Sequence, residues 1–248
     1  MNSSQQTEGL SLGQPVRLPE QLGAPQPMVL KGLHVSLAPI DASRDAPELY
    51  MRSHGNAEKE RVWHYLFNGP FDSAEAMQKN YLAPCEASKE PLFFVVSELA
   101  TNHKVGVVSY LNIAPADLRV ELGHIWYAAE AQHTLINTET IYLMLCHVFD
   151  ELKYRRVEWK CNALNARSRA AAQRLGFSFE GIFYQHLVIK GHNRDTAWFA
   201  MLDRDWPAIK RHMQGYLYQQ SVASLRDANR PLLRCLDPGD AMQAIESV

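Results

Sequence analysis

The stretch EWKCNALNARSRAAAQRLGFSFEGIFYQHLVIKGHNRDTAWFAMLD, residues 158–203, decides the fold of this chain. It opens on a short apolar strand, and an alanine-rich helix over Asn165–Leu175 follows. Gly176 stands directly after that helix, where glycine accepts the left-handed conformation that ends many helices. Two strand-like runs, Gly181–Ile189 and Asp195–Leu202, then flank a group of turn residues. Strand, helix and hairpin in this order predict one end of a mixed sheet.

The upstream residues predict the rest of an α/β pattern. Apolar residues alternate over several short runs, and helical spacing separates them. The expected order is strand, two helices, a three-stranded meander, a helix and a strand, and it predicts a mixed sheet with helices on its faces. The expected elements are Leu33–Pro39, Pro47–Ala57, a helix capped by Asp72 or Ser73, Pro91–Leu99, Val105–Ile113, Val120–Tyr127, Leu135–Leu152 with Asn137 or Thr138 as its N-cap, and Arg156–Cys161.

Composition excludes several classes of protein. The chain has 248 residues, 46% of them hydrophobic and 21% charged, as in ordinary globular proteins. A net charge of −2 argues against a general nucleic-acid binder, which is usually basic. No apolar run reaches the roughly 20 residues that a membrane span needs. The four cysteines form no CxxC pair and the start of the chain lacks a secretory pattern, so free thiols in the cytoplasm are expected.

The chain divides into three expected segments. Residues 1–30 are rich in Gln, Ser, Gly and Pro and predict an extended or disordered arm. Residues 31–212 hold the α/β pattern. Residues 213–248 are weakly helical over Tyr216–Ala228 and then irregular, and they predict an appendage or a surface for homodimerisation.

From about Gly13 to about Arg211 the order of elements and the motif around Asn165 resemble the GNAT N-acyltransferases. The branch that acetylates ribosomal proteins is the most similar. The resemblance implies the GNAT fold, with a V-shaped split between the strand that ends at Tyr127 and the strand that starts at Arg156. It also implies acetyl-CoA as the cosubstrate in that split, an amine as the acceptor, and no metal.

The resemblance implies a phosphate site at the helix that begins near Leu135. Helix N-termini bind phosphates through unpaired N–H groups and a favourable dipole. The family loop is (Q/R)-x-x-G-x-(G/A), and here it reads Gln132-His-Thr-Leu-Ile-Asn137. Gln132, Asn137 and Thr138 are the expected contacts, although Leu135 and Asn137 replace two small residues that allow close backbone approach. A capped amphipathic helix without a ligand is the alternative interpretation.

Other cofactor contacts are implied around the split. The backbone of Ile125, Trp126 and Tyr127 would pair with the pantetheine amides as an added strand. Asn165 matches the family residue that binds the pantetheine arm, and as an alternative it is a helix N-cap. Arg167 and Arg169 could reach the phosphates, as could Arg174 further along, or they form a solvated helix face.

Two residues are the candidate catalytic groups. Glu121 matches the strand carboxylate that serves as the base in the histone-acetylating branch, and strict alternation would place it with Gly123 and Ile125 on one face, opposite His124 and Trp126. A structural partner for Arg or Lys is the other interpretation of Glu121. Ser168 matches a serine near the cofactor sulfur and could protonate the leaving thiolate. His124 and His186 are alternative bases, because imidazole titrates near neutral pH.

The sequence departs from its relatives at three further positions. Ala172 replaces a phenolic acid, Leu187 replaces the glutamate base of the ribosomal branch, and Tyr184 stands where an arginine is usual. We therefore expect transfer of an acetyl group to a primary amine of a small molecule or a protein N-terminus. Transfer of another short acyl group such as succinyl, acyl-CoA binding without catalysis, and a dimeric module without CoA are the alternatives. At least half of a set of aromatic residues expected near the acceptor should be buried: Trp63, Tyr65, Phe67, Phe71, Phe183, Tyr184, Trp198 and Phe199.

Overall fold

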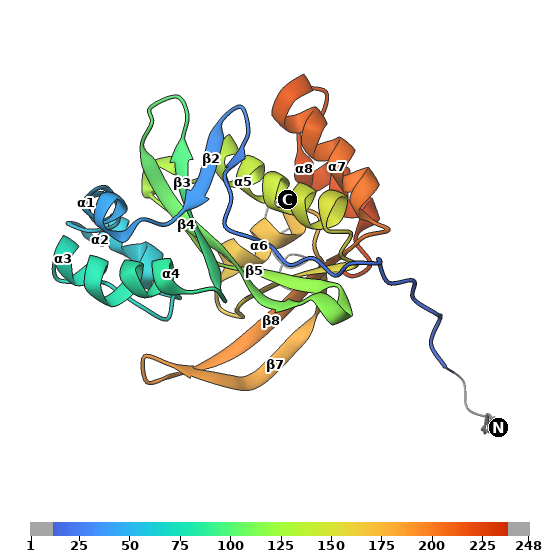
Figure 1. Cartoon of the computed structure of the whole chain (residues 1–248), viewed down its shortest axis with the longest axis horizontal. Coiled ribbons are helices and arrows are strands. Elements are labelled where there is room, and N and C mark those ends of the chain that lie inside the picture. Colours follow the sequence, from blue (N-terminus) through green and yellow to red (C-terminus); the bar gives the residue numbers. More distant parts are fainter. Residues whose placement is uncertain (1–11, 238–248) are drawn as a thin grey trace, which may run out of the picture.

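The computed structural model describes residues 12–237, and within them one eight-stranded mixed sheet runs through the molecule (Figure 1). The strands lie in the order β1-β2-β3-β4-β5-β6-β8-β7. All neighbouring strands are antiparallel except β5 and β6, which are parallel. Their bounds are β1 Leu30–Lys31, β2 Val35–Pro39, β3 Leu92–Glu98, β4 Lys104–Ala114, β5 Arg119–Tyr127, β6 Arg156–Asn162, β7 Ser178–Ile189 and β8 His192–Leu202.

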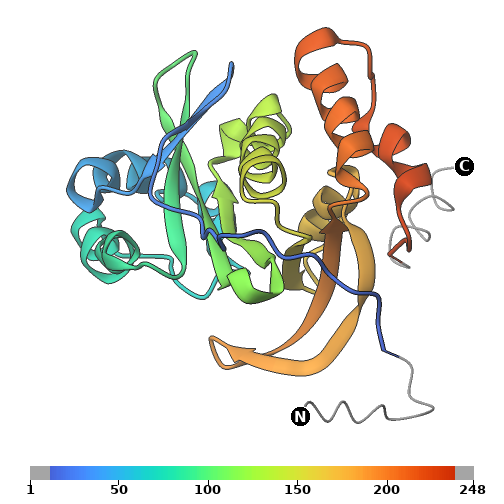
Figure 2. The ribbon, with the colours of Figure 1, turned by 45° about the vertical axis from the view of Figure 1, so that its right-hand side comes forward.

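Helices cover both faces of the sheet (Figure 2). The first face carries α1 (Ala42–Ser53), α2 (Ala57–Glu60), α3 (Ala74–Met77) and α4 (Ala83–Ala87), joined by η1 (Arg61–Trp63) and η2 (Gln78–Leu82). The second carries α5 (Leu135–Leu145) with its continuation η5 (Cys146–Glu151), α6 (Ala166–Arg174), α7 (Trp206–Gln214) with η6 (Gly215–Gln219), and α8 (Leu225–Asn229). The segments η3 (Pro115–Asp117), η4 (Ala129–Ala131) and η7 (Arg230–Leu232) are short connections. Each face therefore has its own core, and the two clusters of buried side chains are separate.

The parallel strands β5 and β6 part halfway along their length. Their paired positions run from Arg119 opposite Arg156 to Leu122 opposite Trp159, and the strands diverge beyond them. The predicted V-shaped split is therefore present. Helices α5 and α6 follow these two strands, so both begin at the open end of the split.

A β-bulge in β5 shifts the side chains beyond Gly123 to the opposite faces. Trp126 pairs with Val107 and Gly123 with Ser109, so two residues of β5 lie opposite one residue of β4. His124 takes the required left-handed conformation with φ 50°. Strict alternation was therefore wrong for this strand, because Trp126 packs in the cluster under α1–α4 and not with Leu122.

Two helix starts differ from those expected. Helix α1 begins after Asp41, whose carboxylate accepts from the N–H of Arg44 at 2.9 Å, so Pro47 lies inside the helix and not at its start. Helix α5 is capped by Thr134, whose hydroxyl accepts from Ile136 N–H at 3.2 Å. Several Thr and Asn residues could cap α5, and the one directly before the first helical residue does so.

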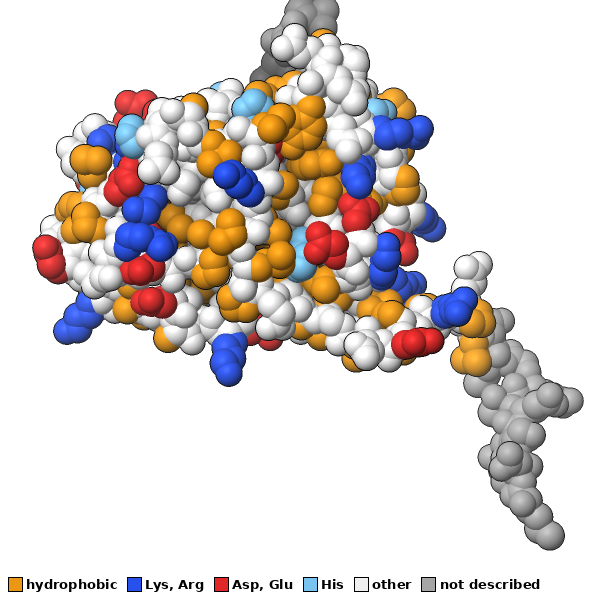
Figure 3. All heavy atoms as spheres, turned by 45° about the horizontal axis from the view of Figure 1, so that its top comes forward, with side chains coloured by type: hydrophobic (Ala, Val, Ile, Leu, Met, Phe, Trp, Pro, Cys, Tyr) orange, Lys and Arg blue, Asp and Glu red, His pale blue; other side chains and the backbone are white. Residues whose placement is uncertain are grey.

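The segment after residue 202 packs on the second core. The expected boundary at residue 213 falls inside the continuous helical run of α7 and η6. Trp206, Ile209, Met213 and Leu217 are buried with the residues of α5 and β6. On the face in Figure 3, acidic and basic side chains are interspersed among hydrophobic ones. Among the described residues no helix is long and apolar enough to cross a membrane.

Candidate active site

A cleft of about 2260 Å³ opens where β5 and β6 part. Residues 57–70, the second half of β5, the first turns of α5 and α6, and the β7–β8 hairpin line it. Carboxyl ends of parallel strands and the N-termini of the helices that follow meet at one edge of a sheet, which is the usual place for a ligand in such folds.

One end of the cleft suits phosphates. The cleft passes the start of α5, where the first N–H groups of a helix have no intrahelical acceptor. Arg167, Arg174 and Arg226 also line the cleft. The guanidinium of Arg174 donates to the hydroxyl of Thr138 at 2.9 Å, and burial lowers its pKa. A partly buried cation with a neutral partner, beside a helix N-terminus, fits a phosphate.

The backbone of Ile125, Trp126 and Tyr127 borders the cleft beyond the last β5–β6 pair. Gln132 donates to the carbonyl of Tyr127 at 3.0 Å, which fixes the chain between β5 and α5. The Trp126 side chain is buried and its indole donates to the hydroxyl of Tyr81 at 3.2 Å. The main chain of this segment is thus the part that can meet a ligand.

The motif at α6 lies along the same cleft. Asn165 caps the helix, since its side-chain oxygen accepts from the N–H of Ser168 at 3.1 Å. The hydroxyl of Ser168 accepts from the indole N–H of Trp159 at 3.0 Å. That bond leaves the hydroxyl hydrogen of Ser168 for an acceptor, and the sulfur of Cys161 is within hydrogen-bond reach of this hydroxyl. Asn165, Arg167 and Ser168 all line the cleft.

The cleft does not include two of the expected cofactor contacts. Arg169 donates to the carboxylate of Asp237, and to the carbonyl of Ala163 at 2.8 Å. Thr138 is fully buried, and its hydroxyl accepts a hydrogen bond from the Arg174 guanidinium. Asn137 does line the cleft, and its buried side-chain oxygen has no hydrogen-bond partner among residues 12–237.

Glu121 is a buried carboxylate in the middle of the cleft, with an exposed fraction of 5%. Lys160 contacts its Oε2 at 2.7 Å and Asn112 donates to the same oxygen at 2.6 Å. Glu121 is therefore an ion-pair partner of Lys160 that also lines the cleft, and its role as a base stays a prediction. Both contacts use Oε2, and Oε1 has no hydrogen bond within the described part of the chain.

His124 lies in the same wall of the cleft. Its Nδ1 is 3.0 Å from the hydroxyl of Ser109, which itself donates to the carbonyl of Gly123. The hydroxyl hydrogen is thereby used, so we assign the imidazole proton to Nδ1 and the lone pair to Nε2. Burial, helped by the nearby charge of Arg194, lowers the pKa of His124 to about 4. The other histidine considered, His186, is exposed and pairs with Thr196 at 3.0 Å.

The aromatic residues expected near the acceptor divide between core and cleft. Only Trp63 and Phe199 of the eight are fully buried, so the expectation that half would be buried was wrong. Trp63, Tyr65, Phe67 and Trp198 line the cleft. Tyr184 is 75% exposed on β7 and lies outside it. Several of these side chains belong to the edge hairpin and its facing loop, where one side meets solvent.

Sequence reasoning missed four residues that shape the cleft. Lys160 and Asn112 hold Glu121, Arg194 projects from β8, and Arg226 comes from α8. The parallel register pairs Glu121 with Glu158, and Lys160 lies two residues beyond Glu158 on the same face of β6. The alternation of side chains along β6 could therefore have indicated that Lys160 lies near Glu121. Arg194 and Arg226 carry no local signal, because tertiary packing alone brings them to the cleft.

A mixed sheet with a split parallel pair, helix N-termini at the open end of the split and a buried carboxylate in the cleft is typical of the acyl-CoA acyltransferase class. Comparison with known proteins is more specific. The chain belongs to the GNAT acetyltransferase family, whose "Acetyltransferase (GNAT) domain" model matches residues 34–178. It is thus an acyltransferase enzyme of that family.

Individual similar proteins are also acetyltransferases by name. A GCN5-related N-acetyltransferase from Brucella melitensis is 34% identical, with a TM-score of 0.80 over 85% of this chain and 99% of that one. The "Putative ribosomal N-acetyltransferase YdaF" of Bacillus subtilis is 26% identical over 70% of this chain and 92% of its own length. The microcin C7 self-immunity acetyltransferase MccE, solved with acetyl-CoA and AMP, is 21% identical with a TM-score of 0.61 over 69% and 93% of the two chains. The last likeness concerns the fold alone.

Proposed function

We propose that this enzyme transfers an acetyl group from acetyl-CoA directly to a primary amine of a small molecule or a protein N-terminus. The observation that carries the proposal is the open β5–β6 split, with a helix N-terminus and the partly buried Arg174 at its mouth. A long cofactor with phosphates at one end and a thioester at the other requires such a cleft.

Different groups of this chain would bind the two parts of acetyl-CoA. The first turn of α5, together with Arg167 and Arg174, would hold the phosphates. The free edge of β5 at Ile125 and Tyr127 would accept and donate backbone hydrogen bonds to an extended ligand. Side chains longer than glycine at Leu135 and Asn137 leave the helix N–H groups in place, since these belong to the backbone.

Proton transfer would use groups already in the cleft. Acetyl-CoA supplies the acetyl group as a thioester, and the acceptor must lose a proton for its nitrogen to bond to the acetyl carbon. Glu121 would take that proton through its free Oε1, directly or through a water. Ser168, whose hydroxyl oxygen accepts from Trp159, would donate its hydrogen toward the departing sulfur.

Calorimetry with acetyl-CoA tests the donor site. We expect micromolar binding by the wild type and at least about tenfold weaker binding by Arg174→Gln, because a charge-assisted hydrogen bond is lost. Arg204→Gln is the matched control, since Arg204 is exposed and 3.9 Å from its partner Asp205. The absence of heat at millimolar acetyl-CoA would overturn the proposal.

Asn165 needs a variant that preserves the helix. Asn165→Ala removes an N-cap, so its effect on binding would mix with a loss of about 1 kcal/mol in helix stability. Asn165→Ser keeps a capping oxygen and shortens the side chain. A thiol-release screen over amines then identifies the acceptor, and binding without turnover on any amine would favour a noncatalytic acyl-CoA-binding protein.

A further inference from the structure

Arg194 is a buried cation without a carboxylate partner. It lies in β8 on the cleft wall and its exposed fraction is 8%. Among residues 12–237 it forms no ion pair, and its buried Nε has no hydrogen-bond acceptor. Its guanidinium carbon is 5.4 Å from the centroid of the Phe67 ring. The buried Nε of this guanidinium has lost water without gaining an acceptor, which is costly unless a ligand supplies one.

The carboxylates near Arg194 are engaged elsewhere. Glu121 binds Lys160 at 2.7 Å, and Glu158 binds Arg156 at 2.8 Å. Glu158 also contacts Lys160 at 3.0 Å and Arg119 at 3.9 Å, so both carboxylates are already paired with cations of β5 and β6. Burial lowers the pKa of Arg194, and Cys161 and then Glu121 oppose this. Arg194 therefore leaves one positive charge unmatched on this side of the cleft.

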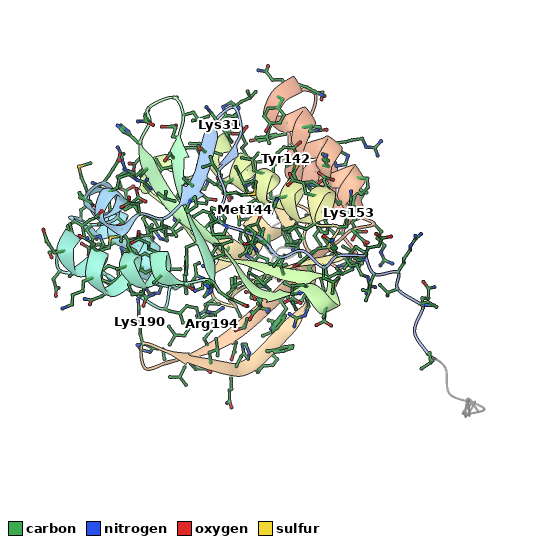
Figure 4. All side chains as sticks on the ribbon, viewed as in Figure 1. Lys31, Tyr142, Met144, Lys153, Lys190 and Arg194 are labelled. Carbon is green, nitrogen blue, oxygen red and sulfur yellow. The ribbon has the colours of Figure 1, made fainter. Side chains whose placement is uncertain are left out.

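The hairpin that carries Arg194 is fixed in place. Lys190, at the end of β7, donates to the carbonyls of Trp63 at 2.8 Å and Asn68 at 3.1 Å. These bonds tie the hairpin to the facing loop. Figure 4 shows Lys190 and Arg194 on the side of the hairpin that faces the body of the molecule. Arg194 is thus held in the cleft, beside Phe67 and His124.

We propose that Arg194 binds a carboxylate of one of the two substrates, either on the acceptor amine or at the far end of a dicarboxylic acyl group such as succinyl. The proposal rests on the acyl-CoA transfer proposed above. A guanidinium fork matches a carboxylate in shape, and one free cation matches its single charge. A dianionic phosphate fits less well, because Glu121 lies in the same cleft.

Two arms distinguish the sources of the carboxylate. In the donor arm, calorimetry compares acetyl-CoA with succinyl-CoA on the wild type and on Arg194→Met. In the acceptor arm, thiol release from acetyl-CoA compares amino acids with their decarboxylated amines. We expect a preference of at least about tenfold for the carboxylate-bearing member in one arm, and its loss in Arg194→Met.

The stability of Arg194→Met separates binding from a structural role. Methionine fills a similar volume without charge, so the free enzyme should melt about 2–4 °C higher or more once the unmatched cation is gone. A lower melting temperature would indicate that Arg194 supports the fold, and would overturn the proposal.

Arg167→Gln is the matched control for the calorimetric comparison of the two acyl-CoA donors. Loss of a cation at the proposed phosphate end should weaken the binding of acetyl-CoA and succinyl-CoA equally.

The outcomes separate this inference from the proposed function. Normal acetyl-CoA binding without a carboxylate preference in either arm would overturn the role of Arg194 alone. A preference that persists in Arg194→Met would also overturn it. Failure of the wild type to bind either acyl-CoA would overturn the acyl-transfer proposal and this inference with it.

Discussion

Two candidate bases, Glu121 and His124, lie on β5 three residues apart in the cleft. Glu121 has one oxygen committed to Lys160 and Asn112 and the other without a hydrogen bond in the described chain. His124 is held neutral, because burial lowers its pKa to about 4. A neutral imidazole with so low a pKa is a weak base at pH 7. We place the base at Glu121 because its Oε1 faces no donor in the described chain.

We predict that Glu121→Gln lowers kcat by about 100-fold or more and leaves acetyl-CoA affinity within about threefold, because the amide cannot accept the proton. Steady-state thiol release and calorimetry measure the two quantities. Glu158→Gln is the control, since Glu158 contacts the same Lys160 at 3.0 Å but does not line the cleft. Full activity in Glu121→Gln, together with inactive His124→Gln, would assign the base to His124.

His124 also predicts a dependence of stability on pH. The unfolded imidazole binds a proton near pH 6.5 and the folded one near pH 4, so between these values the unfolded state holds more protons. Stability therefore falls as the pH is lowered from about 6.5 to about 4, by on the order of 3 kcal/mol. Urea unfolding at pH 7 and pH 4.5 should show a smaller loss in His124→Gln. Equal losses in the two proteins would contradict the prediction.

At the scale of elements, the hairpin β7–β8 depends on one lysine for its position over the cleft. Lys190→Met removes the bonds to the carbonyls of Trp63 and Asn68. We expect faster amide hydrogen exchange in residues 187–194 and 63–70, because these segments then open locally. Lys31→Met, an exposed lysine on β1, is the control. Unchanged exchange at the hairpin would show that backbone pairing alone holds it.

Most strands and helices follow from periodicity and capping residues. The meander, the helix that begins at Leu135, Asn165 as an N-cap and Gly176 with φ +98° were predictable. The alternation of apolar residues does not reveal the β-bulge in β5, because a bulge is an extra residue relative to the partner strand and not a change of residue type. Beyond Gly123 the side chains nevertheless point to the opposite faces of the sheet. The parting of β5 from β6 leaves the main chain of Ile125–Tyr127 at the cleft.

Part of the candidate site could also be predicted, from the order of strands and helices. Residues at the ends of β5 and β6 and the starts of α5 and α6 must meet, because the strands are parallel. Gln132, Asn165 and Ser168 belong to this group and line the cleft, and Glu121, in the paired half of β5, lines it as well. Residues from the hairpin and from α8 reach it only through tertiary packing, which no local pattern encodes.

At the scale of the whole molecule, one buried carboxylate joins three distant parts of the chain. Glu139 of α5 is fully buried and accepts from the N–H groups of Leu33, His34 and Val35 at 2.9, 2.6 and 2.7 Å. It also accepts from the hydroxyl of Tyr218 at 2.8 Å. The start of β2, the central helix and the C-terminal helical run are therefore fastened at one point.

We predict that Glu139→Gln destabilises the protein by about 3 kcal/mol or more, because an amide NH₂ group would face backbone donors and leave buried N–H groups unsatisfied. Tyr218→Phe removes a single bond from the same carboxylate and should cost only about 1 kcal/mol. Urea unfolding of both variants measures the difference. Since Glu139 lies outside the cleft, folded Glu139→Gln should bind acetyl-CoA as the wild type does. A loss in Glu139→Gln no larger than in Tyr218→Phe would show that the loop before β2 satisfies its N–H groups by other means, and that the three segments are not fastened through this residue.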